Sequence, residues 1–234
     1  MTKTSALILL SAASLPAATI ITSHDGFIRE GQATVVQDGG TGVDLALRSD
    51  NSANNDNVRK VYFKFDLSGF NADLNSSATF TTTISSRSAN QNGNRAFYFY
   101  GLNAGFTATG GELGSDWTET ALTWNNAPGN DRTTNVDSGF NPATTTLIQT
   151  NDNQYNSNVG KVYTITIANL GDFVQADNTV TLMASWSDTT EYAFASRENT
   201  TVAYHPSLEF NTIPEPTTLV SALVGGLLGL RRRR

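Results

Sequence analysis

Short runs of alternating apolar and polar residues dominate the interior of the chain. They are rich in Thr, aromatic and β-branched residues, which favour strands, and occupy residues 61–65, 78–85, 96–100, 161–167, 179–186 and 207–210. Clusters of Gly, Asn and Asp separate these runs and are typical of tight turns. No long segment keeps a helical period, although residues 167–175 could form one short helix or turn. The pattern predicts an all-β fold, a single antiparallel β-sandwich or barrel.

The first residues have the parts of a secretory signal peptide. Lys3 supplies a positive charge, residues 6–13 are apolar, and small residues follow at Ala17, Ala18 and Thr19. The apolar run is too short to cross a bilayer core of about 30 Å. We therefore expect residues 1–18 to be removed as a signal peptide, with a buried N-terminal strand or helix as the alternative. The cleavage site itself is not defined, because neither residues 15–17 nor residues 16–18 form a clean small-x-small triplet.

The last residues also have three parts. Pro214, Glu215 and Pro216 come first, and an apolar stretch at residues 219–230 follows. The chain then closes on four basic residues, Arg231, Arg232, Arg233 and Arg234. Basic residues resist transfer across a membrane, so they hold this end on the cytoplasmic side. The arrangement resembles the PEP-CTERM sorting signal of bacteria with exopolysaccharide-rich surfaces.

That resemblance implies a route of export for the chain. Residues 214–234 would act as a sorting helix that inserts transiently into the membrane, and the enzyme exosortase would recognise the tripeptide and remove the tail. Residues 19–213 would then form the mature domain. It is expected at the cell surface or in the extracellular matrix of a Gram-negative-type bacterium.

Without its two ends the chain is strongly acidic. The mature part keeps 10 basic and 20 acidic side chains, because five of the 15 Lys and Arg and one of the 21 Asp and Glu lie in the sorting segments. Such a surface repels phosphate backbones, so we expect no nucleic-acid partner. The absence of cysteine excludes disulfides and thiol chemistry. A domain of this kind could use one structural Ca²⁺ held by loop carboxylates and carbonyls, although the sequence does not identify the ligands.

Several segments, in order, resemble one family of bacterial domains. They are residues 25–31, 45–48, 59–68, 117–128, 194–198 and 205–210. Together they look like the DNRLRE domain, also described as the family 96 carbohydrate-binding modules, and the most specific block is residues 117–128. The resemblance implies a jelly-roll β-sandwich that is non-catalytic, binds acidic glycans such as alginate and often holds a structural calcium. The usual setting differs in one respect, because this module stands alone with no enzyme attached.

Arginines are the candidate ligands for an acidic glycan. A planar guanidinium engages a carboxylate through two hydrogen bonds, which suits a polyuronate. Arg48, Arg59 and Arg197 lie in three separate family segments, and we predict that they contact the glycan. The alternative interpretation makes them structural braces, each paired with a nearby carboxylate. The carboxylates in question are Asp25, Glu30, Asp66 and Glu198.

Aromatic residues are the candidate stacking platforms for a sugar ring. Tyr98 and Tyr100 share one strand face and Phe97 and Phe99 take the other, because alternate residues point to opposite sides. The tyrosines, with their polar tips, are the predicted glycan contacts. The two tryptophans of the specific block, Trp117 and Trp124, are expected to pack under a long loop instead.

Catalysis has little support in the sequence. Neither His24 nor His205 sits in a metal-ligand spacing, and no nucleophile elbow, phosphate loop or HExxH helix is present. We therefore expect a non-catalytic, glycan-binding module. The alternative is a structural matrix protein that packs against copies of itself without binding a specific sugar.

Overall fold

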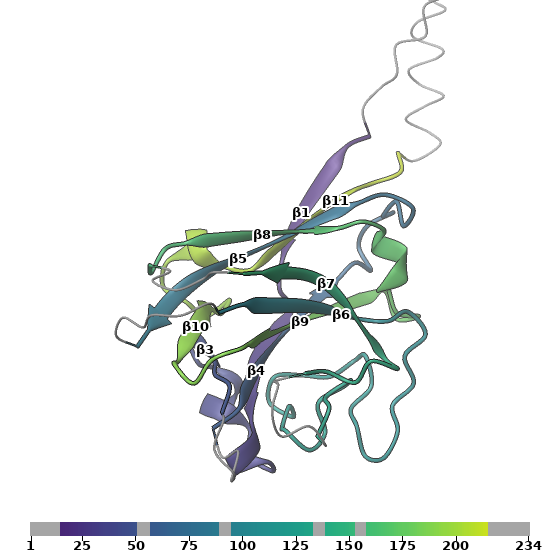
Figure 1. Cartoon of the computed structure of the whole chain (residues 1–234). Helices are drawn as coiled ribbons and strands as arrows, with labels where there is room; N and C mark the ends of the chain where they lie inside the picture. The colour runs from purple at the N-terminus through teal and green to yellow at the C-terminus, as the bar shows by residue number, and fades with distance from the viewer. Residues whose placement is uncertain (1–14, 51–56, 89–94, 133–138, 153–157, 215–234) are drawn as a thin grey trace, which may run out of the picture.

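The computed structural model describes residues 15–50, 57–88, 95–132, 139–152 and 158–214. Within them the chain forms strands joined by loops and by short 3₁₀ turns (Figure 1). The strands are β1 (Ala17–Ile21), β2 (His24–Arg29), β3 (Asp44–Leu47), β4 (Arg59–Asp66), β5 (Ala78–Arg87), β6 (Phe97–Leu102), β7 (Thr145–Asn151), β8 (Val162–Ile167), β9 (Thr179–Trp186), β10 (Tyr192–Ala195) and β11 (Ser207–Asn211). The 3₁₀ turns are η1 (Glu30–Gln32), η2 (Gln37–Gly40), η3 (Leu170–Asp172) and η4 (Val202–Tyr204).

The strands form two antiparallel sheets packed face to face. One sheet has the order β1-β11-β5-β10-β3, with β8 pairing β5 from the other side, and the second has the order β2-β4-β9-β6-β7. The predicted all-β sandwich is thus confirmed, and its shape is consistent with a jelly roll. The six predicted runs coincide with β4, β5, β6, β8, β9 and β11, and η3 lies inside the segment expected to form a short helix or turn.

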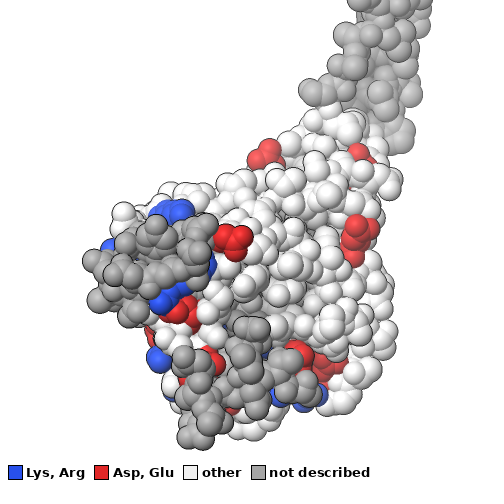
Figure 2. All heavy atoms as spheres, in the orientation of Figure 1, with Lys and Arg blue, Asp and Glu red and all other residues white. Residues whose placement is uncertain are grey.

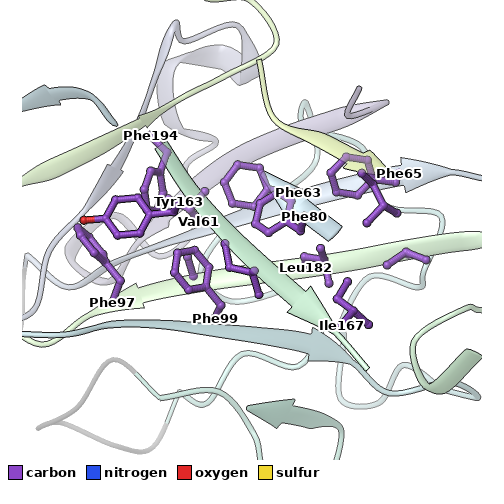
Figure 3. Packing of buried hydrophobic residues seen from close by; sticks show 14 of the residues in the cluster. Val61, Phe63, Phe65, Phe80, Phe97, Phe99, Tyr163, Ile167, Leu182 and Phe194 are labelled. Atoms are coloured by element: carbon purple, nitrogen blue, oxygen red, sulfur yellow. The ribbon is translucent and has the colours of Figure 1, made fainter. Parts of the chain in front are cut away.

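The main core fills the space between the sheets. Alternation along β4 sends Val61, Phe63 and Phe65 inward, where they meet the inward side chains of β5, β6 and β9 (Figure 3). The rings of Phe63 and Phe80 lie 5.0 Å apart across the two sheets. All members of this cluster are apolar or aromatic, so burial of their surface supplies most of the driving force for folding.

A long connection covers the outer face of the second sheet. We call it the cap: residues 103–144, of which 103–132 and 139–144 are described. Trp117 and Trp124 from the cap pack on Tyr62 of β4 and Met183 of β9 in a second buried cluster. The indole N–H of Trp117 donates to the Thr181 hydroxyl at 3.0 Å. The prediction that both tryptophans pack under a loop is confirmed.

The first and last described strands pair with each other. In the β1–β11 ladder Ala17 lies opposite Asn211, and the Thr212 N–H and hydroxyl donate to the Pro16 carbonyl at 2.8 and 3.0 Å. The sandwich therefore includes Ala17 and Ala18, two residues that the sequence assigned to the signal peptide. The position of the cleavage site stays a prediction.

The rest of the two predicted sorting segments lies outside the described residues, which leave out 1–14 and 215–234. Glu215, Pro216 and the four terminal arginines belong to that part. In the described ranges, no helix is long and apolar enough to cross a membrane.

Candidate functional site

A groove of about 350 Å³ lies at one end of the sandwich, where β2 and β4 of one sheet approach β3 and β10 of the other. Most of the side chains around it are polar, and one ring, Phe27, adds an apolar surface. The lining residues are Phe27, Arg29, Gln32, Gln37, Asp38, Asp44, Ala46, Arg59, Ser86, Glu191 and Ala193. Both sheets therefore contribute to one concave surface rich in hydrogen-bonding groups.

A glycine-containing turn shapes one wall of the groove. Within η2 the backbone of Asp38 has φ +50°, and Gly39 and Gly40 have φ +63° and +78°. Asp and Gly are the residues that adopt this left-handed region at low cost. A Cβ atom on Gly40 would lie 2.9 Å from the Glu119 backbone, so the turn also packs tightly against the cap. This turn places Gln37 and Asp38 at the groove.

Three arginines occupy neighbouring positions beside the groove. Arg29 of β2 is the register partner of Arg59 of β4, and Arg48 forms an isolated bridge with Arg59. The Arg59 N–H donates to the Arg48 carbonyl at 2.8 Å, and the Arg48 N–H donates back at 3.3 Å. We call Arg29, Arg59 and Arg48 the arginine row. Arg29 and Arg59 lie on β2 and β4 of one sheet, and Arg48 directly follows β3 of the other, so the row links the two sheets at this end.

Charges around the arginine row are mixed. Arg59 forms an ion pair with Glu191, and Arg29 donates to the Asn57 side chain at 2.9 Å. Burial lowers the pKa of Arg59; the neighbouring Glu191 charge opposes this shift, and Arg29 and Arg48 add to it. Two arginines and three carboxylates line the groove itself. Figure 2 likewise shows Lys and Arg away from the β1–β11 end, with Asp and Glu among them.

Arg197 lies at a different place from the arginine row. Its guanidinium donates to Glu119 and Glu198, each at 2.6 Å, and to the Ser23 carbonyl. Its backbone N–H donates to the Asp25 carboxylate at 2.9 Å. Asp25 precedes Arg29 by four residues on β2, about 13 Å along an extended strand. These contacts are those of the brace described by the alternative interpretation, and Arg197 does not line the groove.

A buried polar network surrounds Arg197 and ties the cap to β2. Glu119 of the cap accepts from Arg197, and its second oxygen lies 3.4 Å from the His24 ring nitrogen. Asp25 accepts from the Thr22 hydroxyl at 2.8 Å. Burial raises the pKa of Asp25 to about 7. We call Thr22, His24, Asp25, Glu119 and Arg197 the latch.

The two predicted tyrosines do not join the arginines. Tyr98 and Tyr100 lie on the outer face of β6, whereas Phe97 and Phe99 point into the main core, as the alternation predicted. Tyr100 packs on Phe140 of the cap with ring centroids 4.9 Å apart. Arg59 shares the inward face of β4 with Val61 and Phe63, so Arg59 and the tyrosines lie on opposite faces of the same sheet.

Several groove residues were not singled out from the sequence. They are Phe27, Gln32, Gln37, Asp38, Asp44 and Glu191. The only signal was the Asp-Gly-Gly cluster at residues 38–40, which indicated a turn but gave no sign of which strands it would face. Five segments far apart in the chain meet here, and no local pattern encodes that meeting.

The described residues contain no cluster of metal-binding side chains. No group of three or more His, Cys, Asp or Glu side chains within those ranges could hold a metal ion. A second hollow of about 270 Å³ in the cap has Glu112 and Asp131 in its lining, together with the cation Arg132. A structural Ca²⁺ stays a prediction, with no ligand set assigned.

The fold and the groove define a two-sheet β-sandwich domain with one mixed-charge, hydrogen-bonding groove. No known family model matches the chain, and no curated protein matches it. Among solved structures, the chain is similar to the N-terminal endo-1,4-β-D-xylanase 10B of Clostridium thermocellum, in a structure of its CBM22-1–GH10 modules complexed with xylohexaose. The TM-score is 0.30 at 13% identity, covering 83% of this chain and 29% of that one. The DNRLRE and PEP-CTERM resemblances stay predictions.

Proposed function

We propose that this domain binds a polysaccharide in the groove between β2, β3, β4 and β10 and does not transform it. The observation that carries the proposal is the composition of the groove, in which amide, guanidinium, hydroxyl and carboxylate groups surround Phe27. Sugar hydroxyls both donate and accept hydrogen bonds, and these side chains offer both partners. Phe27, which packs partly against the main core, adds an apolar contact for a pyranose.

The arginine row supports an acidic glycan as the ligand. A uronate carboxylate can accept two hydrogen bonds from one guanidinium. Arg29 and Arg59 line the groove from the adjacent strands β2 and β4, and Arg48 bridges Arg59 without lining the groove itself. A uronate would compete with Glu191 for Arg59. Because Asp38 and Asp44 line the same groove, the ligand carboxylate must sit close to the arginines to be attracted. Binding should therefore be sensitive to salt.

Export and surface display form part of the same proposal. Strand β1 begins beside the end of β11, so the segments that precede residue 15 and follow residue 214 attach at one end of the sandwich (Figure 1). The groove is built by other strands, β2, β3, β4 and β10, so an anchor at the β1–β11 end would leave it accessible. Exosortase and transient membrane insertion are the partners that this arrangement would need during sorting.

A pair of groove variants with opposite expected effects tests the proposal. Alginate, pectate and neutral xylan fragments would be titrated into the wild type, Arg59→Gln and Asp44→Asn at low and moderate salt. Loss of a hydrogen bond to a charged group contributes about 1.5–3 kcal/mol, so Arg59→Gln should weaken uronate binding roughly 10- to 100-fold. Asp44→Asn removes a repulsive charge and should strengthen it.

The matched control is Lys161→Gln, which removes one positive charge next to β8 at a residue that does not line the groove. It should leave the affinity unchanged. Equal affinity for xylan and alginate would overturn the acidic specificity, and no binding to any glycan would overturn the function and favour a purely structural matrix protein. New reducing ends or unsaturated products after incubation would contradict the non-catalytic assignment.

A further inference from the structure

Two lysines of β4 are buried although lysine is normally exposed. Lys60 and Lys64 alternate with the core residues of this strand, so both point to the outer face of the sheet, where the cap covers them. Lys60 is 1% exposed and Lys64 is 5% exposed. Neither touches the groove described above.

The side-chain nitrogen of Lys60 lies against a side-chain amide of the cap. Nζ is 2.8 Å from Asn130 Oδ1, 3.2 Å from the Asp131 carbonyl oxygen, and also contacts the Gly139 carbonyl. The faces of Trp124 and Phe140 complete the enclosure, with ring centroids 4.6 and 5.1 Å from Nζ.

The Asn130 amide is held in a fixed orientation. Its residue is 5% exposed, and its Nδ2 donates to the Trp124 carbonyl at 2.8 Å. A β-bridge to Phe140 fixes its backbone. The carbonyl side of the amide therefore faces Nζ, and the amide nitrogen faces away from it. A primary amine and a carboxamide are thus positioned together in a largely buried site, and Asn130 also borders the second hollow of the cap.

We propose that Lys60 and Asn130 become joined by an isopeptide bond. The lone pair of the neutral Lys60 amine attacks Cγ of Asn130, and a bond forms between Nζ and Cγ. The bond between Cγ and Nδ2 then breaks, and Nδ2 leaves as ammonia after receiving a proton from Nζ. The product is a secondary amide plus one molecule of ammonia, with no oxidant or cofactor consumed. The remaining Nζ–H keeps one carbonyl partner.

The surroundings favour the neutral amine that this step requires. Burial lowers the pKa of Lys60 to about 7, so a large share of the amine is uncharged near neutral pH. The carboxylates of Asp131 and Glu30 are close enough to act on the charge of Lys60.

Lys64 provides an internal comparison on the same strand. Its Nζ donates to the backbone carbonyl of Trp117 and lies 5.4 Å from the centroid of that ring. Burial lowers its pKa as well. Attack on a backbone carbonyl would have to expel the amine of the next residue and so cleave the chain, whereas the Asn130 side chain releases only ammonia; this second buried lysine should therefore stay unmodified.

A bond between Lys60 and Asn130 would link an interior strand to the cap across 70 residues of sequence. A cross-link of that kind stabilises a fold by restricting the unfolded chain, and the restriction grows with the length of the closed loop. The chain has no cysteine and cannot form a disulfide.

Mass spectrometry of the purified full chain tests the bond directly. The measured intact mass should be lower, by the mass of one ammonia molecule, than the mass calculated from the sequence of the purified chain. After denaturation and trypsin digestion, residues 60–64 should remain joined to residues 96–132, because a modified Lys60 is not cleaved. An unmodified mass, with free peptides for both segments, overturns the proposal and leaves an ammonium held by hydrogen bonds only.

Variants identify the two atoms. Lys60→Met and Asn130→Ala should each restore the unmodified mass, and Lys64→Met should leave the loss of ammonia intact. Asn130→Asp should lose water in place of ammonia, since the same bond would form from a carboxyl group. Loss of ammonia that persists in Asn130→Ala would assign it to another residue and overturn the proposed pair.

Discussion

The two buried clusters of this protein are built from the same strands by different rules. On the inner face of β4, Val61, Phe63 and Phe65 enter a core whose members are all hydrophobic residues. On its outer face, Lys60, Tyr62 and Lys64 meet the tryptophans of the cap. The inner cluster is held by packing between two regular sheets. In the outer cluster, each buried polar group needs its own hydrogen-bond partner.

The reason for this difference lies in the backbone of the cap. A sheet satisfies its own N–H and C=O groups, whereas a long connection without strands leaves carbonyls to be paired by side chains. Lys60 and Lys64 donate to the carbonyls of Asp131, Gly139 and Trp117 in this way. A loop can thus be packed onto a sheet face when buried lysine side chains donate the hydrogen bonds that a neighbouring strand would otherwise supply.

The largest effect is expected from a truncation in the inner cluster. Phe63→Ala removes a fully buried ring that contacts Phe80 and Phe194, and should cost about 3–5 kcal/mol of unfolding free energy. Urea unfolding followed by far-UV circular dichroism measures it. Val202→Ala, at a side chain 74% exposed, is the control and should change little. Similar losses in both variants would contradict the assignment of the core.

The next effect is a pH dependence that arises in the latch and not in the inner cluster. The Asp25 pKa is raised to about 7 from 3.8, mainly by burial, with Glu119 and Glu198 nearby. The folded state then keeps a proton that the unfolded chain releases, so stability is lost as pH rises from about 4 to about 7. The steepest slope is about 1.4 kcal/mol per pH unit.

Unfolding of the wild type and Asp25→Asn at several pH values between about 4 and 6, below the range in which Lys60 titrates, measures this dependence. The variant should flatten the profile, because the amide does not titrate. Glu209→Gln, at an exposed position on β11, should leave the profile unchanged. A wild-type profile that rises across this range would contradict the raised pKa.

A smaller loss of stability should show whether the cap unfolds before the two sheets. Lys64→Met keeps most of the apolar stem but leaves the Trp117 carbonyl without its buried donor, which should cost about 1–3 kcal/mol. Tryptophan emission should shift to longer wavelength at lower urea than the far-UV signal changes. If the two probes stay coincident, the cap and the sheets unfold as one unit.

The smallest effect is expected at Arg197. It tests whether this residue has a structural role, in contrast to the glycan-binding role proposed for the arginine row. Arg197→Ala breaks the contacts with Glu119 and Glu198 at a partly exposed site and should lower stability by about 1 kcal/mol. Glycan affinity should remain within about twofold of the wild type, in contrast to Arg59→Gln. A loss of affinity without loss of stability would return Arg197 to the binding site.

Strands with alternating or Thr-rich runs could be predicted from the sequence, and others could not. β4 and β9 were predicted, because apolar residues recur at alternate positions along both strands. β10, with four consecutive buried residues, and β3, with three, have no alternation to detect. The first two residues of β1, Ala17 and Ala18, were assigned to the signal peptide because small residues fit both roles.

The site was less predictable than the fold. Arg59 was selected and does line the groove, because a family segment marked its strand. Arg197 was selected on the same ground, and the tyrosines for their residue type, but neither a family segment nor residue type determines which sheet face or strand end a side chain occupies. The burial of Lys60 and Lys64 was equally hidden, since a lysine that alternates with apolar residues has the pattern of a solvated face.

The pairing of β1 with β11 has a consequence for how the domain responds to force. Ala17 and Asn211 are partners at the outer end of an antiparallel ladder. Opposite forces applied to these two residues would therefore break the hydrogen-bonded pairs of the ladder one after another, starting from this end. Each step would need only a small tension, and β1 would peel away before the sheets open. Tension applied between Asn211 and an interior residue of β5 would load the β11–β5 ladder in shear. In that ladder the four pairs from Ser207–Thr81 to Phe210–Ala78 must yield together. The sandwich would thus be compliant between its two ends and stiff along β11.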